Sequence, residues 1–338
     1  MSDFNILAIE TSCDDTSVAV VNSEYDVLAN LTSTQDIHQK YGGVVPELAS
    51  RLHIKYLMPL TADCLSKAKM TLVKIDAVAV AVNPGLIGSL LVGTSFAKSL
   101  AYSLGKPLIA VNHMLGHVYA NKLTHPHLVP PFLALVVSGG HTELVFFSGP
   151  NEFKIVGRTQ DDAAGEAFDK IAKLLGLGYP GGPIIDRLAI EGNAQFVGFP
   201  RGLNRRDNYN FSFSGLKTAV LNYLEDKDPQ YIKEHIADIA ASAQMAIVES
   251  LVTKTIRFAR NNNIMYIVLA GGVSANSLLR RMMQEETEKF SANLYYPDLE
   301  YCMDNAAMIG AAAIEKYKKR EFASLDLNPF PTKGLRVL

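Results

Sequence analysis

The fold is decided by the stretch Ile6-Leu-Ala-Ile-Glu-Thr-Ser-Cys-Asp-Asp-Thr-Ser-Val-Ala-Val-Val21, which aligns without gaps with Phe132-Leu-Ala-Leu-Val-Val-Ser-Gly-Gly-His-Thr-Glu-Leu-Val-Phe-Phe147. Each copy is an apolar, β-rich run that breaks at small polar residues and then resumes, which predicts a β-hairpin. Its turn exposes backbone N–H groups and hydroxyls, so it can cradle a phosphate. The identical positions are Leu7/Leu133, Ala8/Ala134, Ser12/Ser138 and Thr16/Thr142.

A second pair of similar segments follows the two hairpins. The run 77–82 leads into Asn83-Pro84-Gly85, and the run 266–270 leads into Gly271-Gly272. Each reads as a buried strand, a glycine turn and the N-terminus of a helix. The repeated order predicts an α/β protein built from two duplicated lobes around a central cleft.

The chain has 338 residues, which favours two domains over one. The segment His125–Pro131 contains three prolines and is the expected boundary. We therefore expect an N-terminal lobe over residues 1–125 and a C-terminal lobe over residues 131–300. A C-terminal helix over residues 304–321, rich in alanine, is expected to pack back on the N-terminal lobe.

Composition excludes several classes of protein. With 48% hydrophobic and 20% charged residues, the chain is neither largely disordered nor collagen-like. Its formal net charge of −2 gives no global field that would attract nucleic acid or an anionic membrane. The longest uncharged stretch, residues 77–97, is interrupted by Asn83-Pro84-Gly85 and reads as strand, turn and helix, not as a membrane span.

Cysteine usage and the N-terminal sequence both bear on location. Three widely spaced cysteines suit a reducing compartment and free thiols better than a disulfide framework. The N-terminal segment MSDFNILAIE lacks the basic region of a signal peptide and the Arg- and Ser-rich character of an organelle presequence. Together they predict a cytoplasmic protein.

His113 and His117 are four residues apart, so on a helix both imidazoles project from one face and can share a metal ion. The spacing alone is equally compatible with a structural role. Met114 stands where the HExxH metallopeptidase pattern has its water-activating glutamate, which argues against that chemistry. Asp304 is a candidate third ligand, although it could equally be the N-cap of the alanine-rich helix.

Glycine-rich segments of the second half supply further candidate positions. Ser138-Gly139-Gly140 lets a ligand approach the backbone, or is simply a tight turn. The segment 165–170 reads as a short helix, and a loop rich in glycine and proline, residues 178–183, ends near Asp186. Asn276 could bind a nucleotide base or ribose, or could cap a helix.

Two basic clusters interrupt the near-neutral sequence. One contains Arg201, Arg205 and Arg206, and the other is Lys318-Lys319-Arg320. Such runs are usually solvated, but contact with RNA phosphates would need patches of this kind.

Taken together, eight motifs resemble the tRNA threonylcarbamoyladenosine transferase family, TsaD, in order from Ile6 to about Ala313. The combination is far more specific than any single motif. The motifs are Ala8-Ile-Glu-Thr-Ser-Cys-Asp14, Gly42-Gly-Val-Val-Pro-Glu-Leu-Ala-Ser-Arg-Leu-His53, Pro84-Gly-Leu-Ile-Gly88, Asn112-His-Met-Leu-Gly-His117, Ser138-Gly-Gly-His-Thr142, Gly165-Glu-Ala-Phe-Asp169, Tyr179-Pro-Gly-Gly-Pro183 and Gly271-Gly-Val-Ser-Ala-Asn276.

The resemblance implies an actin-like ATPase (ASKHA) fold and an acyltransferase. In that reaction L-threonylcarbamoyl-adenylate donates its threonylcarbamoyl group to N6 of the adenosine 3′ of the anticodon in tRNAs that read ANN codons, and AMP leaves. One metal ion, iron or zinc, is implied at His113, His117 and Asp304. The sequence matches the family pattern at every implied adenylate-binding position. These positions are Val136, Val137, Ser138, Gly139, Gly140, Asp169, Gly182, Asp186 and Asn276.

The resemblance also implies partners, and it leaves the general base open. The first turn resembles the bacterial and mitochondrial branch, and the lack of a presequence favours the bacterial members. These usually work with a paralogous partner, TsaB, and a small ATPase, TsaE, whereas mitochondrial members act without them. Glu10, Asp14 and Asp15 are candidates for the group that takes the proton from N6, unless they are solvated turn residues. The rival functions are an ATP-driven actin-like scaffold or chaperone, a metallopeptidase, and a silent subunit of the same fold, which should lack the two metal histidines.

Overall fold

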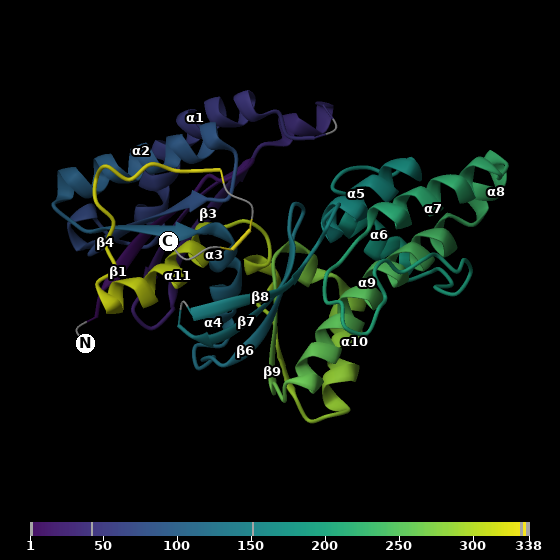
Figure 1. Cartoon of the computed structure of the whole chain (residues 1–338). Helices are drawn as coiled ribbons and strands as arrows, with labels where there is room; N and C mark the ends of the chain where they lie inside the picture. The colour runs from purple at the N-terminus through teal and green to yellow at the C-terminus, as the bar shows by residue number, and fades with distance from the viewer. Residues whose placement is uncertain (1–2, 42, 151, 332–333, 336–338) are drawn as a thin grey trace. The chain divides into compact units, whose positions relative to one another are not determined.

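The computed structural model describes residues 3–41, 43–150, 152–331 and 334–335. The chain forms two compact units (Figure 1). Unit 1 contains the residues up to Leu128 and those from Pro297 onward, and unit 2 is Val129–Tyr296. The division falls inside the proline-rich segment His125–Pro131, and unit 2 is thus inserted into the sequence of unit 1.

Unit 1 is built on a five-stranded sheet of order β3-β2-β1-β4-β5. The hairpin β1-β2 and the next strand β3 are antiparallel, whereas β4 and β5 run parallel to β1. The strands are β1 (Asn5–Glu10), β2 (Asp15–Asn22), β3 (Val27–Thr34), β4 (Ala77–Asn83) and β5 (Leu108–Asn112).

Unit 2 has a sheet of the same design, with order β10-β9-β6-β7-β8. Its hairpin β6-β7 is extended by the antiparallel β8, and β9 and β10 are parallel to β6. The strands are β6 (Phe132–Val137), β7 (Thr142–Gly149), β8 (Glu152–Arg158), β9 (Tyr266–Ala270) and β10 (Asn293–Tyr295). The matching strand orders confirm the duplication predicted from the two hairpins.

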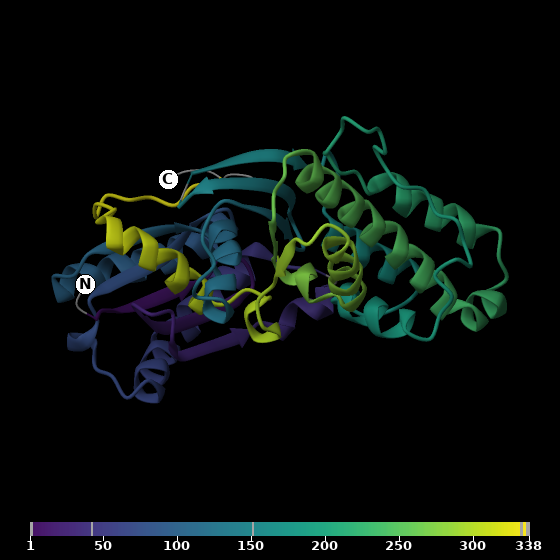
Figure 2. The same ribbon diagram turned by 90° about the horizontal axis from the view of Figure 1, so that it is seen from below.

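The helices of unit 1 cover both faces of its sheet (Figures 1 and 2). Leucines, isoleucines and valines of one face pack under α1 and α2, while α11 lies against the other face. Gly310 of α11 allows the close approach, because a Cβ there would lie 2.7 Å from Val21 Cγ2. These helices are α1 (Pro46–Lys67), α2 (Ile87–Leu104), α3 (His113–Tyr119), α4 (Asn121–Thr124) and α11 (Ala306–Lys319).

The core of unit 2 lies between one face of its sheet and the helices of the same unit, with α9 contributing most of the buried helical side chains. The helices are α5 (Ala164–Leu174), α6 (Gly181–Ala189), α7 (Ser214–Glu225), α8 (Pro229–Glu234), α9 (Ile236–Asn261) and α10 (Ser277–Glu288), with the 3₁₀ turn η3 (Gly272–Ala275) before α10.

The described residues contain one helix, α9, that is long and apolar enough to cross a membrane, and 67% of its most apolar window is buried within the protein. Burial of this extent is typical of the core helix of a globular domain. The uncharged stretch 77–97 forms β4, a glycine turn and part of α2, as its interruptions predicted. The three cysteines have free thiols.

Candidate active site

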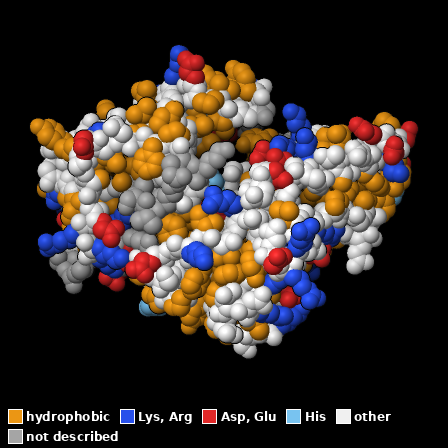
Figure 3. Space-filling model, in the orientation of Figure 1, with side chains coloured by type: hydrophobic (Ala, Val, Ile, Leu, Met, Phe, Trp, Pro, Cys, Tyr) orange, Lys and Arg blue, Asp and Glu red, His pale blue; other side chains and the backbone are white. Residues whose placement is uncertain are grey.

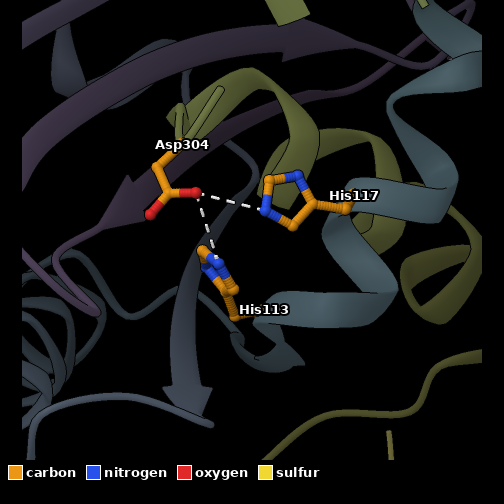
Figure 4. Close-up of side chains that lie close together, drawn as sticks. All are labelled: His113, His117 and Asp304. Atoms are coloured by element: carbon orange, nitrogen blue, oxygen red, sulfur yellow. Dashed lines mark ion pairs between the residues drawn. The ribbon is translucent and has the colours of Figure 1, made fainter. Parts of the chain in front are cut away.

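His113, His117 and Asp304 come together in unit 1 (Figure 4). Asp304 Oδ1 lies 3.4 Å from His113 Nε2 and 3.1 Å from His117 Nε2. One ligand atom from each residue lies within 4.8 Å of the other two. The two histidines face one side of α3, as their spacing predicted, and the carboxylate reaches them from the segment before α11.

Two asparagines hold the ends of the helices that carry this cluster. Asn112 caps α3 by accepting a hydrogen bond from Leu115 N at 3.1 Å. Asn305, and not Asp304, caps α11 by accepting from Met308 N at 3.0 Å. Because the neighbouring residue takes the cap position, the Asp304 carboxylate is left to face the histidines.

The environment of the cluster fits a bound cation. Both ring nitrogens of His117 are buried, and among the described residues neither has a hydrogen-bond partner of good geometry. Burial alone would lower the pKa of His113, but the carboxylates of Glu10 and Asp304 raise it well above its usual value. Burial would likewise raise the pKa of Asp304, yet His113 and His117 hold it well below its usual range. The cluster thus favours positive charge, and two imidazoles with one carboxylate are suitable ligands for iron or zinc.

Glu10, one of the three predicted candidates for the general base, lies beside His113. It is the last residue of β1 and is fully buried. Glu10 Oε2 lies 2.9 Å from His113 Nδ1, and Oε1 accepts a hydrogen bond from Ser12 N. Ser12 Oγ is 3.1 Å from the same histidine nitrogen. This is the arrangement in which a carboxylate fixes the orientation and tautomer of a metal-ligating histidine.

Of the other two carboxylates, Asp14 lies in the turn between β1 and β2 and Asp15 is the first residue of β2, and both are partly exposed. Burial raises the pKa of Asp15 to about 7, with nearby carboxylates adding to the shift. A carboxylate with a pKa near neutrality has the protonation behaviour that a general base needs.

A buried histidine of α1, His53, fixes the same turn. This role was not predicted, because in the sequence His53 stands out only as the last residue of a motif. His53 Nδ1 lies 2.8 Å from Thr16 Oγ1, and its Nε2 lies 2.9 Å from Cys13 O. One ring nitrogen therefore holds the backbone of the turn, and the other holds a hydroxyl at the start of β2.

In unit 2 the predicted phosphate-binding turn lies at the end of β6. Ser138 N donates to His141 O at 2.9 Å, and the positions of a Cβ at Gly139 and Gly140 are open, with no atom within 4 Å. Gly165, in the first turn of α5, packs tightly behind this turn, because a Cβ there would lie 2.6 Å from Ser138 O. The helix N-terminus and the open turn together favour an anion.

Val136 and Val137 are fully buried within β6, so only their backbone could serve a ligand. The Cβ position of Gly271 lies 2.4 Å from Val137 O, and Gly271 has a φ of +85° that favours glycine. This glycine lets η3 pack against the end of β6 in the way that Gly85 packs on Ser12 O in unit 1.

The remaining predicted binding residues gather around α6. Asp169 Oδ1 accepts from Gly181 N at 2.7 Å, and burial raises the pKa of this carboxyl while the amides of Gly181 and Gly182 oppose the rise. The helix begins at Gly181, so Asp186 lies on a helix and not at the end of a loop as expected. A proline in the first turn, Pro183, is compatible with this early start.

Asn276 takes one of the two roles that the sequence left open, the cap of a helix. Its Oδ1 caps α10 by accepting from Leu279 N, while its Nδ2 donates to Asp186 Oδ1 at 3.1 Å and to Gln244 Oε1 at 2.9 Å. Asp186 also accepts from Ser277 N and Ser277 Oγ. Gln244 was not predicted, since a single polar residue inside an apolar helix carries no local signal of function.

The solved structures that resemble this chain share its fold. HypF of T. kodakarensis superposes with a TM-score of 0.65 at 14% identity, covering 96% of this chain and 48% of HypF. Component A of the Acidaminococcus fermentans (R)-2-hydroxyglutaryl-CoA dehydratase superposes with a TM-score of 0.54 at 14% identity, covering 94% and 99% of the two chains. These likenesses confirm the predicted actin-like ATPase fold.

The sequence comparisons identify the family. Residues 26–311 match the model of TsaD, tRNA N6-adenosine threonylcarbamoyltransferase. A protein of that name from Moorella thermoacetica is 50% identical to this chain, over 98% of this chain and 97% of the relative. One from Thermosipho africanus is 52% identical, over 93% of this chain and 94% of the relative. One from Clostridium botulinum is 49% identical over 98% of both chains. The chain therefore belongs to the TsaD family of tRNA N6-adenosine threonylcarbamoyltransferases, the transferases of t⁶A tRNA modification.

Proposed function

We propose that this chain transfers the threonylcarbamoyl group of L-threonylcarbamoyl-adenylate to N6 of the adenosine 3′ of the anticodon in tRNAs that read ANN codons, with release of AMP. The observation that carries the proposal is the buried cluster of His113, His117 and Asp304 in a chain of this family. A nucleotide-driven scaffold of the same fold would have no use for it. A kinase of this fold would use carboxylates and magnesium on phosphates instead.

We infer that one iron or zinc ion is held by His113, His117 and Asp304. When bound, such an ion supplies Lewis acidity, which can polarise a carbonyl oxygen. Glu10 then acts as a positioning residue, because its contact with His113 Nδ1 keeps Nε2 free to bind the metal. Since both oxygens of Glu10 are engaged, Asp14 and Asp15 remain the candidates for the general base.

The donor is assigned to unit 2. Residues 136–140 are assigned to this donor, and the open backbone at Gly139 and Gly140, together with the N-terminus of α5, is suited to the phosphate. Asp169, Gly182, Asp186 and Asn276 are assigned to the ribose and the base. An acyl-adenylate is already activated, so the protein needs no covalent nucleophile and chiefly has to orient the donor and stabilise developing charge.

We further propose that the chain works in the cytoplasm with a TsaB-like paralogue and a TsaE-like ATPase. Shared binding of tRNA across such an assembly would suit the chain's net charge of −2.

The test is transfer of labelled threonine from threonylcarbamoyl-adenylate to a tRNA transcript by the purified chain, alone and with the two partners. His113→Ala is compared with His127→Ala, a histidine of the same unit that is exposed and outside the cluster. We expect the first variant to lose both bound metal and transfer, and the second to keep both.

Three outcomes would contradict the proposal. ATP turnover without transfer in any mixture would favour the scaffold, and chelator-sensitive peptide cleavage would favour the metallopeptidase. Unchanged metal content in a variant with alanine at all three ligand positions would place the metal elsewhere.

A further inference from the structure

Four arginines gather on one surface of unit 2, and neither the metal cluster nor the donor positions use them. They are Arg205 and Arg206, in the loop between α6 and α7, and Arg257 and Arg260, in the last turns of α9. We call these four residues the arginine surface. Arg205 and Arg206 are exposed, and Arg257 and Arg260 line a surface hollow of about 420 Å³ between α9 and α10.

The loop is held on α9 by side chains of the helix. Arg257 Nη1 donates to Arg205 O at 3.2 Å, and Nη2 donates to Asn208 O at 3.3 Å. One turn earlier, the buried Lys254 donates to Gly202 O at 3.1 Å and to Asn210 O. These bonds place Arg205 and Arg206 beside the C-terminal part of α9, so residues 50 positions apart in sequence present one basic surface.

Aromatic rings orient the two guanidinium groups of α9. The guanidinium carbon of Arg257 lies 5.6 Å from the ring centroid of Tyr209, and that of Arg260 lies 5.0 Å from the centroid of Phe290. Both Nη atoms of Arg257 donate to carbonyls of the loop, so this arginine holds the loop in place. Arg205, Arg206 and Arg260 are exposed, and a planar guanidinium can bind a phosphate with two parallel hydrogen bonds.

Two carboxylates, Glu249 and Glu286, line the same hollow, and each also pairs with a basic residue outside the arginine surface. Glu249 forms a salt bridge of 2.6 Å with Arg201. Arg201, although part of the predicted basic cluster, is therefore not counted in the arginine surface. Glu286 lies 3.9 Å from Arg260 and is contacted more closely by Lys289. Asp207 is the remaining acidic neighbour in the loop.

A local basic surface matters in this protein because the chain as a whole is slightly acidic. On the face shown in Figure 3, blue and red side chains are interspersed, in keeping with a net charge of −2. Affinity for a nucleic acid comes mainly from neutralising phosphates and releasing counterions.

We propose that the arginine surface binds the phosphate backbone of the tRNA substrate. The proposal rests on tRNA being the substrate of this family.

The test compares Arg205→Gln/Arg206→Gln with Lys69→Gln/Lys74→Gln, which removes the same charge from two exposed lysines of unit 1. The full chain is titrated with an unmodified transcript of a tRNA that reads ANN codons, over a series of salt concentrations. Loss of two phosphate contacts should weaken binding about tenfold near 0.1 M salt and make the slope of log K against log salt less negative by about 1.5. The KM for tRNA should rise by a similar factor, with kcat and AMP affinity unchanged.

Equal affinity and equal salt slope for the arginine variant and wild type would overturn the proposal, and so would an equal loss in the lysine variant. Loss of affinity for a protein partner with tRNA binding unchanged would assign the surface to protein recognition instead. Thermal melting of both variants controls for unfolding. If the wild type transfers threonylcarbamoyl and the arginine variant binds tRNA as tightly as the wild type, only this inference is overturned. If the wild type binds no tRNA, the proposed function is overturned as well.

Discussion

At the scale of single residues, the proposed metal ligands and the carboxylate of Glu10 behind them have different roles. Asp304 faces both histidines, while Glu10 faces only the far nitrogen of His113. A histidine that donates its Nδ1 proton to Glu10 presents an unprotonated Nε2 toward the cluster. The pair therefore determines which atom of the ring is available as a ligand.

Glu10→Gln should weaken metal binding about 10- to 100-fold. To accept the bond from Ser12 N with its oxygen, a glutamine has to turn its NH₂ group toward His113 Nδ1. Nδ1 would then accept a hydrogen bond, which favours the histidine tautomer with its proton on Nε2, the atom that should bind the metal. The dissociation constant is measured by competition with a chelator. Glu24→Gln, at an exposed position of the same unit, is the control and should bind metal like wild type. Equal metal affinity in the Glu10 variant would show that the contact does not set the tautomer.

At the scale of elements, a glycine stands at or near the start of each helix or turn whose backbone packs closely against the end of a strand. Gly85 packs on the turn after β1, and Gly271 packs on the end of β6. Gly165 does the same from the first turn of α5. In each case a backbone atom occupies the space that a Cβ would need, so the restriction is set by the backbone and cannot be relieved by a change of rotamer.

Gly165→Ala should destabilise the protein by about 1–3 kcal/mol, because the added methyl group collides with Ser138 O and Gly139 Cα. The displaced turn should also lose affinity for AMP. Denaturant unfolding and calorimetric titration with AMP measure the two effects. Gly215→Ala, in the first turn of α7 with no atom within 4 Å of the new Cβ, should be neutral or slightly stabilising. A Gly165 variant that matched this control would mean that α5 can move away without cost.

Most elements could be predicted from the sequence, because both hairpins and both strand-glycine-helix units have strong local patterns. Other features depend on contacts that no local pattern records. Asp304, next to the residue that caps α11, faces histidines that lie nearly 200 residues away in the sequence. Gln244 gains its role only when α9 meets Asn276, and α6 starts at Gly181 because Asp169 accepts from its amide.

At the scale of the whole molecule, the two predicted binding regions belong to different units. All three proposed metal ligands lie in unit 1, and all predicted donor-binding residues lie in unit 2. Unit 1 is itself discontinuous, since α11 returns after the whole of unit 2 and packs on β1, β2 and α3. Its first 128 residues thus lack both a core helix and one ligand.

A fragment of residues 1–128 should show no cooperative thermal unfolding, because without α11 the face of β1 and β2 that it covers is exposed. Adding a peptide of residues 297–338 should restore a cooperative transition and metal binding, measured by circular dichroism and chelator competition. The same peptide with Asp304→Ala should restore the transition alone. A fragment that unfolds cooperatively and binds metal without the peptide would contradict this account of unit 1.

The insertion of unit 2 between the ligands also has a consequence for biosynthesis. A ribosome that has finished β5 and α3 has made both histidines, but the carboxylate that joins them is encoded some 190 codons later. A site of this kind binds its ion tightly only when every ligand is in place, so the nascent chain cannot hold an ion at the proposed site before Asp304 has emerged from the ribosome. The proposed metal site therefore forms only after the whole of unit 2 has been synthesised.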